Sequence, residues 1–391
     1  METNTIHSVD DLLTVTVERD ASDLHLTAGS PPVIRVNGRL ERVPGHENLT
    51  PEEIRTLMYR ILSTEQQKFL ETRRQIDFSH SIPGLARFRV NCYFQRASVG
   101  AAFRLIPAEI KSLEQLGIPT RLYELADKAR GLILVTGPTG SGKSTTLASL
   151  LDHINHARHE HILTIEDPIE FLHRHGTCIV NQREIGPDAT SFAEALRSAL
   201  RQDPDVILVG EMRDLETIGT ALTAAETGHL VFATLHTQSA PTTIDRVIDV
   251  FPAEQQGQVR VQLASTLQGV VTQNLVPTAD GLGRTAALEI LMPDDAVRNL
   301  IRQAKVEQIY SVMQTSTSRG MQTMEQSLAD LVLRNVITPE LAFARSSRAD
   351  QLQGLLERSG MTNFTAPAPA DGSSAGNETP AESGLRLAKE V

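Results

Sequence analysis

A short segment in the middle of the chain restricts its fold more than any other feature. It reads Gly137-Pro138-Thr139-Gly140-Ser141-Gly142-Lys143-Ser144-Thr145 and fits the pattern G-x-x-x-x-G-K-[ST]. The apolar run 132–135 precedes it, and residues 145–151 continue with the pattern of a helix. A buried parallel strand, a glycine-rich loop and the start of a helix therefore follow one another, which is the context in which this pattern surrounds phosphate groups. The segment predicts an α/β fold that binds a nucleoside triphosphate.

The side chains and amides of this loop have separate predicted roles. The backbone N–H groups of 137–145 would bind the phosphates, and the positive end of the following helix would strengthen that attraction. Lys143 would bring its ammonium group to the β- and γ-phosphates, and Ser144 would offer its hydroxyl to Mg²⁺. ATP and Mg²⁺ are therefore the expected ligands.

Length and composition favour two soluble domains. The chain has 391 residues, which is more than one hydrophobic core usually organises. It is 40% hydrophobic and 22% charged, with a formal net charge of −11, which argues against direct nucleic-acid binding through a basic surface. The two cysteines, Cys92 and Cys178, cannot build a four-cysteine zinc site, and we expect buried thiols in a reducing compartment.

The sequence contains no signal for a membrane span. No apolar stretch approaches the roughly 18 residues that such a span needs, and the N-terminus lacks a basic segment followed by an apolar one. We therefore expect a cytoplasmic protein that contacts a membrane only through its partners.

Residues 1–108 are predicted to form a small α/β domain. Strands are expected at 23–26, 33–36, 87–94 and 101–106. Along 87–94 the side chains alternate, with Phe88, Val90, Cys92 and Phe94 on one face and Arg87, Arg89 and Asn91 on the other. Such alternation indicates a half-buried strand. The segment Thr50-Pro51-Glu52-Glu53 is a capping box that predicts the start of a helix.

A linker at 109–120 is predicted to lead into a larger domain at 121–361. Short apolar runs at 133–136, 162–165, 206–209 and 230–235 alternate with helical patterns such as 214–227 and 191–202, of which the second starts with the capping box Ser191-Phe192-Ala193-Glu194. This alternation predicts a mostly parallel sheet flanked by helices. From about residue 253 the chain is expected to be largely helical, with one strand at 286–291, and residues 362–391 are expected to be a disordered tail.

Carboxylates that follow two of the predicted strands indicate the chemistry. Glu211 ends the segment 205–211 in the arrangement called Walker B, which we expect on the strand next to that of the phosphate loop, where it can hold Mg²⁺. Glu166, Asp167 and Glu170 follow the strand 162–165. A cluster like this needs a cation or a proton-transfer role, so one member could activate water and Glu166 is a further candidate metal ligand. A charged loop rim is the alternative.

Two histidines flank the predicted strand 230–235. His229 and His236 lack a credible third ligand for zinc. They are either strand-end histidines with structural hydrogen bonds or sensors of the γ-phosphate at the edge of the sheet.

From about residue 21 to 361 the chain resembles the secretion ATPase superfamily, and within it the retraction ATPases of type IV pili. The resemblance rests on the phosphate loop, on four further blocks at 164–171, 196–205, 211–214 and 228–237, and on the absence of the four-cysteine zinc motif of the extension and secretion branches. The block 164–171 resembles the family's Asp box, and 228–237 its His box. Residues 296–302 resemble a short motif of the retraction branch, with Val297 in place of isoleucine. An amphipathic helix buried in its own domain is the alternative for this last segment.

The resemblance implies an N-terminal PAS-like domain, a RecA-like P-loop ATPase domain and a homohexameric ring with nucleotide near the subunit boundaries. It implies that Glu170 activates water, that Glu211 is the Walker B glutamate, and that His229 and His236 are the His-box pair. The family also brings arginines of the N-terminal domain toward the γ-phosphate. The candidates here are Arg87, Arg89 and Arg104.

The resulting hypothesis is a Mg²⁺-dependent ATPase motor that retracts type IV pili in twitching motility. Its implied partners are an inner-membrane platform protein and the pilus base, at the inner face of the cytoplasmic membrane. The alternatives are an accessory retraction ATPase, a nucleotide-gated scaffold that hydrolyses little ATP, and a nucleic-acid translocase on the same core. Intact Glu170 and Glu211 argue against the scaffold, and the acidic net charge argues against the translocase.

Overall fold

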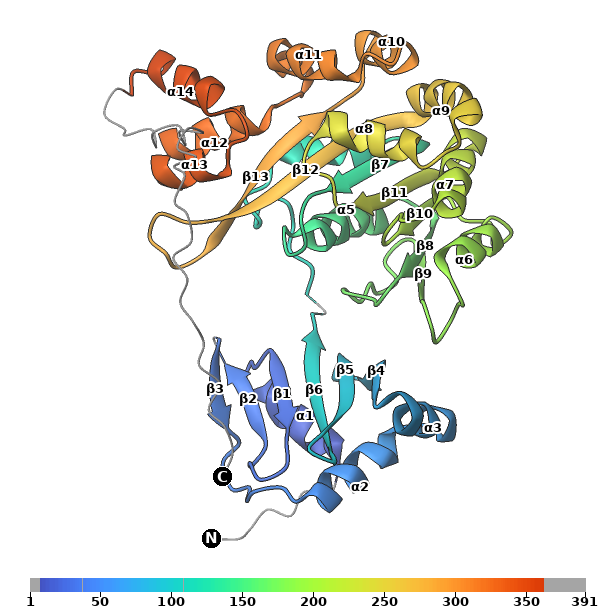
Figure 1. The fold of residues 1–391 in the computed structure, drawn as a ribbon, viewed down its shortest axis with the longest axis vertical. Coiled ribbons are helices and arrows are strands. Elements are labelled where there is room, and N and C mark those ends of the chain that lie inside the picture. Colours follow the sequence, from blue (N-terminus) through green and yellow to red (C-terminus); the bar gives the residue numbers. More distant parts are fainter. Residues whose placement is uncertain (1–7, 37, 108, 362–391) are drawn as a thin grey trace, which may run out of the picture.

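The computed structural model describes residues 8–36, 38–107 and 109–361. Two separate sheets form within this part of the chain, one from its first third and one from the remainder (Figure 1). They lie on either side of the predicted linker 109–120, whose bounds stay a prediction. The predicted tail, 362–391, lies outside the described residues. The α/β fold class is confirmed.

The N-terminal sheet has six antiparallel strands in the order β3-β2-β1-β6-β5-β4. Its strands are β1 (Asp23–Leu26), β2 (Val33–Val36), β3 (Arg39–Arg42), β4 (Gln75–Ile82), β5 (Ala86–Gln95) and β6 (Ser98–Ile106). Its helices are α1 (Val9–Glu18), α2 (Pro51–Ile61) and α3 (Thr64–Arg73). The expected strands are all present, and β3, β4, α1 and α3 are additional.

Two local predictions for this domain hold for their physical reasons. Thr50 caps α2 by accepting a hydrogen bond from the Glu53 amide, while the Glu53 carboxylate accepts one from the Thr50 amide at 2.7 Å. Along β5, the side chains of Phe88, Val90 and Cys92 are buried as expected. Phe94 is only half-buried, and the Arg74 guanidinium lies over its ring.

The C-terminal sheet has seven strands in the order β13-β12-β7-β11-β10-β8-β9. Its strands are β7 (Gly131–Thr136), β8 (His161–Glu166), β9 (Ile179–Glu184), β10 (Val206–Val209), β11 (Leu230–Leu235), β12 (Leu267–Pro277) and β13 (Arg284–Leu291). From β12 to β9 the strands are parallel, and β13 returns antiparallel to β12. Strands β7, β10 and β11 are buried along their whole length, as their continuous apolar sequences predict.

Helices cover both faces of this sheet. Leu132 and Leu134 of β7 face a core shared with α6 (Phe192–Ala199), α7 (Leu215–Thr227), α8 (Ala240–Asp249), α9 (Ala253–Thr266), α10 (Asp295–Arg302) and α11 (Ile309–Thr315). Ile133 and Val135 face the opposite core, with α4 (Tyr123–Ala126) and α5 (Lys143–Ala157). The alternation of side chains along one strand thus separates the two layers of helices.

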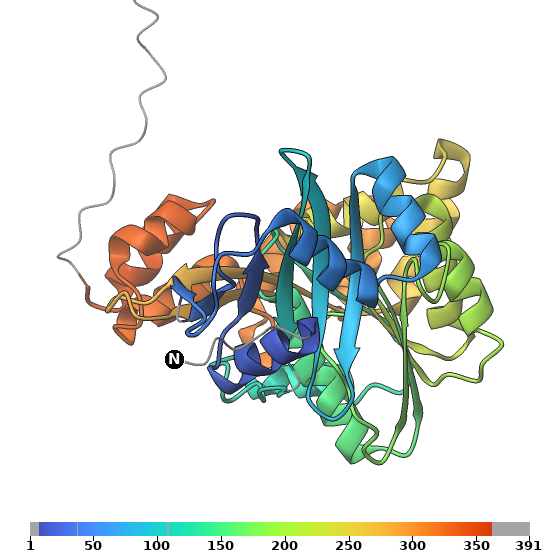
Figure 2. The same cartoon turned by 90° about the horizontal axis from the view of Figure 1, so that it is seen from below.

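A smaller cluster of helices packs on the β12–β13 ribbon. It contains α12 (Met324–Leu333), α13 (Pro339–Arg345) and α14 (Ala349–Arg358). Short 3-10 helices are η1 (Thr120–Leu122), η2 (Val306–Gln308) and η3 (Thr317–Arg319). Viewed from below, the N-terminal sheet lies across the C-terminal domain and α12–α14 extend to one side (Figure 2). Among the helices of the described residues, none is both long and apolar enough to cross a membrane.

Three expectations about the C-terminal domain are wrong. The Walker B strand β10 is not next to β7, because β11 lies between them. The strand β12 lies in a region that was expected to be helical. The sequence did not indicate it because α9 passes directly into β12 at Leu267, without a glycine, proline or polar turn between them. At the start of α6, Ser191 caps the Glu194 amide, but the Glu194 carboxylate accepts from Thr190, so the capping box is incomplete.

Candidate active site

The phosphate loop connects the carboxyl end of β7 to the first turn of α5, as its pattern predicts. Gly137 and Gly142 have φ angles of 135° and 89°. A Cβ atom at Gly137 would lie 2.2 Å from the carbonyl oxygen of Gln273, and one at Gly142 would lie 2.7 Å from the Gln273 side chain. The loop therefore needs glycine at both positions because β12 packs against it.

Lys143 lies at the centre of this loop and is 8% exposed. Its ammonium group donates to the carbonyl oxygens of Gly137 at 2.9 Å and Pro138 at 3.1 Å. Burial lowers the pKa of Lys143, while the nearby carboxylates of Glu170 and Glu211 act in the opposite direction. A cation in this position is suited to exchange loop carbonyls for phosphate oxygens.

A cavity of about 610 Å³ opens beside the loop at the carboxyl edge of the sheet. It is lined by loop residues 139–145 together with Glu166, Asp167, Pro168, Glu170, Phe171, His173, Phe192, Gly210, Glu211, Arg213, Asp214, Thr234, His236, Leu275 and Arg284. The candidate residues Glu170, Glu211, Lys143, Ser144 and His236 are therefore brought together by β7, β8, β10 and β11. Ligands of open α/β sheets bind at this edge.

Glu211 is held by the side chains of Arg213 and His236. Arg213 donates to both of its carboxylate oxygens, at 2.5 and 2.7 Å, and His236 Nε2 lies 3.0 Å from Oε1. The hydrogen bonds from Arg213 lower the pKa of Glu211, with His236 contributing and burial opposing. Glu211 is therefore ionised at neutral pH.

Glu166 and Glu170 lie in different environments. Glu166 is buried, and burial raises its pKa. It accepts hydrogen bonds from Thr164 Oγ1 at 2.6 Å, Gln182 Nε2 at 3.2 Å and the Glu170 amide at 3.4 Å. Glu170 is exposed at the cavity. The geometry favours Glu166 as a support for the loop and Glu170 as the group that faces a substrate, and the metal role of Glu166 stays a prediction.

The two histidines are not a pair within one chain. His236 follows the carboxyl end of β11 and lines the cavity, whereas His229 precedes the amino end of the same strand. They are seven residues apart along the extended chain, a separation of about 23 Å at about 3.3 Å per residue. His229 Nδ1 bonds to the carbonyl oxygen of Ala224 at 2.9 Å. The expectation that both sense one phosphate is therefore wrong for a single subunit, because the strand holds them at opposite edges.

The three candidate arginines are likewise remote from this cavity. None of them is among the described residues that line it. Arg87 donates to Glu184 at 2.9 Å, Arg104 donates to Asp23 at 2.8 Å, and Arg89 is exposed beside a second cavity. Their action on a phosphate of a neighbouring subunit stays a prediction.

The sequence reasoning missed several residues at the site. Arg284 lines the cavity from the start of β13, and Gln273 of β12 accepts from Thr146 Oγ1 at 2.7 Å. Both were missed because β12 was expected to be helical. His173 also lines the cavity, and burial lowers its pKa to about 4, so its imidazole is neutral at pH 7. A lone histidine in a loop gives no sequence signal for this.

The segment 296–302 forms most of α10. Val297 and Ile301 are fully buried in the domain's own core, and Arg298 donates to the carbonyl oxygens of Ala264 and Ser265 at the end of α9. The apolar face of this motif thus packs into the core of its own domain, and its exposed face carries Asn299 and Arg302.

The residues present fit a Mg²⁺ ion bound together with a nucleotide. Within the described residues, no group of three or more His, Cys, Asp or Glu side chains could form an all-protein metal site. Mg²⁺ at phosphate sites needs fewer protein ligands, because phosphate oxygens and water complete its shell. Ser144 and the ionised Glu211 line the same cavity and are suitable donors.

The amino-acid sequence of this chain is similar to those of several known proteins. Residues 2–341 match the family described as "Type II/IV secretion system protein". The type IV pilus retraction ATPase PilT of Pseudomonas aeruginosa is 53% identical over 337 residues, covering 85% of this chain and 96% of the relative. The type IV pilus ATPase PilU of the same organism is 42% identical over 346 residues, covering 88% of this chain and 90% of the relative.

The fold of this chain is also similar to that of a solved structure. The crystal structure of the pilus retraction motor PilT with bound ADP superposes with a TM-score of 0.83 at 50% identity, covering 89% of this chain and 99% of that one. The likeness therefore includes both the N-terminal and C-terminal sheets.

Proposed function

Because the chain belongs to the type II/IV secretion system protein family, we propose that it is an ATPase that powers the retraction of type IV pili. One observation carries the proposal: Lys143, Glu170 and Glu211 converge on one cavity beside the phosphate loop. They do so in a chain that is 53% identical to PilT over 96% of that relative.

The geometry supports a division of labour in hydrolysis. The amides of the loop and the first turn of α5 bind the β- and γ-phosphates, and Lys143 neutralises charge on them. Glu170, exposed at the cavity, accepts a proton from the attacking water. Arg213 and His236 hold Glu211 in its ionised form. Mg²⁺, held through Ser144 and Glu211, would neutralise charge on the phosphates.

Another cavity, next to the one at the phosphate loop, offers space for the nucleoside. It has a volume of about 580 Å³ and shares Gly142, Leu275 and Arg284 with the first. Leu116 and Ile118 of the linker region line it, as does Lys111. An apolar wall beside the phosphate site is suited to a base.

The working assembly in this proposal is a homohexamer in the cytoplasm, at the inner face of the cytoplasmic membrane. It acts on an inner-membrane platform protein and the pilus base, with domain movement coupled to the nucleotide state. Mass measurement of the purified protein with and without ATP tests the ring. A species that stays monomeric with ATP contradicts it.

An accessory role beside a main retraction motor is the second candidate, supported by the 42% identity to PilU. The higher identity to PilT, 53%, favours the main motor. Deleting the protein from its host and complementing with wild type or Lys143→Ala, while pili are imaged, separates the two. We expect retraction to stop in the deletion and to return only with the wild type. Retraction that continues unchanged in the deletion contradicts the main-motor assignment.

A further inference from the structure

Two side chains of the N-terminal sheet reach into the C-terminal domain and end on one carboxylate. Ser79 Oγ of β4 lies 2.7 and 2.9 Å from the two oxygens of Glu184, and donates to them. Arg87 Nη2 of β5 donates to Glu184 Oε2 at 2.9 Å. The side chain of Glu184 is only 4% exposed. A buried carboxylate needs such donors, so this contact is a specific junction between the two domains.

The same carboxylate also contacts the loop that carries Glu170. The Ile169 amide donates to Glu184 Oε2 at 3.4 Å, and the next amide, that of Glu170, donates to Glu166 at 3.4 Å. Glu166 and Glu184 are register partners at the ends of β8 and β9. Two neighbouring carboxylates therefore fix two successive amides of the loop, and Glu184 alone of the two is also bound to the N-terminal sheet.

The surroundings of this junction are open. A cavity of about 720 Å³ lies beside it and is lined by Phe69 of α3 and by Arg89 from the N-terminal side. Asp167 and Pro168, which line this cavity, also line the cavity at the phosphate loop. The loop thus forms a thin wall between the interdomain space and the nucleotide site.

We propose that Glu184 is a positioning residue for ATP hydrolysis. It links Ser79 and Arg87 of the N-terminal domain to the Ile169 amide, so the placement of that domain sets where Glu170 stands in the nucleotide cavity. We call this set, Glu184 with Ser79, Arg87 and the Ile169 amide, the Glu184 clasp. The inference rests on the proposed function, because it assigns a regulation of the same site. It also gives Arg87 a role inside its own subunit, through Glu184 rather than on a phosphate.

Steady-state ATP hydrolysis by the full-length protein tests the clasp. Glu184→Ala is expected to lower kcat by about tenfold to 100-fold, since a small misplacement of a reacting group has effects of that size. KM for ATP should stay within about twofold, since the phosphate loop is untouched. Ser79→Ala, which removes one hydrogen bond without leaving a charge, should lower kcat by roughly fivefold to tenfold. Ser79→Thr keeps the hydroxyl and should restore the rate.

Controls separate this role from a general loss of structure. Ser81→Ala alters an exposed serine of the same strand and should leave kcat unchanged. Hydrogen exchange of the peptide that contains Ile169 and Glu170 should accelerate in Ser79→Ala and stay at the wild-type rate in Ser81→Ala. Equal exchange in these two variants contradicts the clasp.

A double variant tests the role of Arg87. If Arg87 acts through Glu184, Arg87→Ala combined with Glu184→Ala should lower kcat no further than the stronger single change. Losses that multiply place Arg87 outside the clasp and overturn that part of the proposal.

Failure of the clasp and failure of the ATPase assignment give different results. Full kcat in folded Glu184→Ala and Ser79→Ala, together with no turnover in Lys143→Ala, overturns the clasp alone. Turnover that survives in Lys143→Ala overturns the proposed function as well.

Discussion

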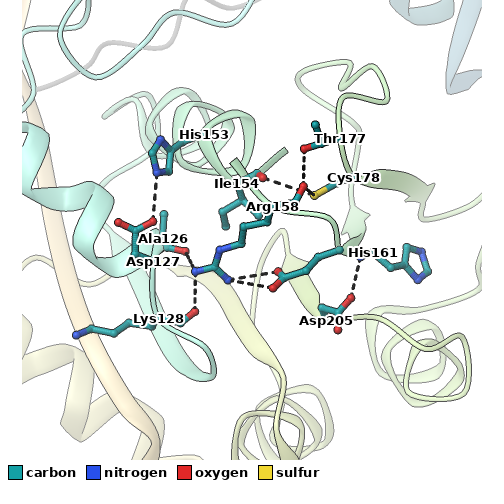
Figure 3. A network of polar contacts seen from close by, with 11 residues as sticks. Ala126, Asp127, Lys128, His153, Ile154, Arg158, His161, Thr177, Cys178 and Asp205 are labelled. Carbon is teal, nitrogen blue, oxygen red and sulfur yellow. Dashed lines mark hydrogen bonds and ion pairs between the residues drawn. The ribbon is translucent and has the colours of Figure 1, made fainter. Parts of the chain in front are cut away.

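The two ends of the C-terminal parallel sheet are both rich in polar side chains. Those at the amino end bond to other groups of the protein, whereas those at the carboxyl end line a cavity. At the amino end, Arg158 donates to the carbonyl oxygens of Ala126 at 2.7 Å and Lys128 at 3.1 Å, and the His161 amide donates to Asp205 at 2.8 Å (Figure 3). At the carboxyl end, Lys143, Glu170 and Glu211 face a cavity. Polar groups at the first end satisfy one another, whereas those at the second face a space that a substrate can enter.

This difference distinguishes polar residues that stabilise the fold from polar residues that act on a substrate. A polar network whose members are bonded to protein holds strands and loops in place. The carboxyl end instead places the carboxylates of Glu170 and Glu211 near the ammonium group of Lys143 at the wall of an open cavity. Substitutions at the carboxyl end are therefore expected to lower activity, and substitutions at the amino end are expected to lower stability.

The largest effect is expected from Lys143→Ala. Loss of the ammonium group removes charge stabilisation at the phosphates and should lower ATP turnover by about 100-fold to 1000-fold. Lys128→Ala is the matched control, because Lys128 is exposed at the amino end and contributes its backbone carbonyl to the network. A phosphate-release assay measures both. Equal turnover in Lys143→Ala and wild type would refute the assignment of the loop.

Glu170→Gln should separate binding from hydrolysis. The amide cannot accept the proton from water, so turnover should fall by about 100-fold or more while ATP binding persists. Glu160→Gln alters a carboxylate that pairs with Arg158 at the amino end, and we expect it to leave turnover near wild type. Titration with a fluorescent nucleotide measures binding. A greater loss of binding than of rate in Glu170→Gln would remove Glu170 from the base role.

The histidines test the comparison on a single strand. His236→Ala removes a partner of Glu211 at the cavity and should lower turnover roughly tenfold, the size expected for a hydrogen bond to a charged group. His229→Ala alters the amino end of β11 and should change turnover by less than about twofold. The two rates are compared at saturating ATP. Equal losses would mean that His229 reaches a nucleotide bound by another subunit.

Arg158→Ala should have the smallest effect on activity and a clear effect on stability. It leaves the carbonyl oxygen of the buried Ala126 without its donor, which costs about 1–3 kcal/mol, whereas water replaces the donor at the exposed Lys128. The midpoint of thermal unfolding should fall by several degrees, while turnover per folded molecule stays at the wild-type value. Lost turnover at an unchanged midpoint would contradict the structural role of the amino end.

Local chemistry made much of the fold predictable from the sequence. The phosphate loop, the capping box of α2 and the buried strands β7, β10 and β11 depend on short patterns, and the structure has them where the patterns indicate. Strand order depends on how crossovers place distant segments, so the insertion of β11 between β7 and β10 could not be derived from spacing. The strand β12 carries no turn signal at its start, and the residues that depend on it, Gln273 and Arg284, were missed with it.

The residues of the site were also only partly predictable from the sequence. Lys143, Glu170, Glu211 and His236 follow buried strands at their carboxyl ends, and parallel strands bring those ends together. His229 has the same residue type and a similar sequence context, but it precedes its strand, and direction along the strand decides its edge. The contacts of Arg87 and Ser79 with Glu184 join residues about a hundred positions apart, which no local pattern reveals.

The most direct test is a crystal structure of this protein with Mg²⁺ and a non-hydrolysable ATP analogue. We expect a triphosphate surrounded by the amides of 140–145, with its γ-phosphate at Lys143 and the Glu170 carboxylate directed at a water in line with that phosphate. An analogue bound elsewhere, or a Glu170 side chain directed away from the γ-phosphate in every subunit, would contradict it.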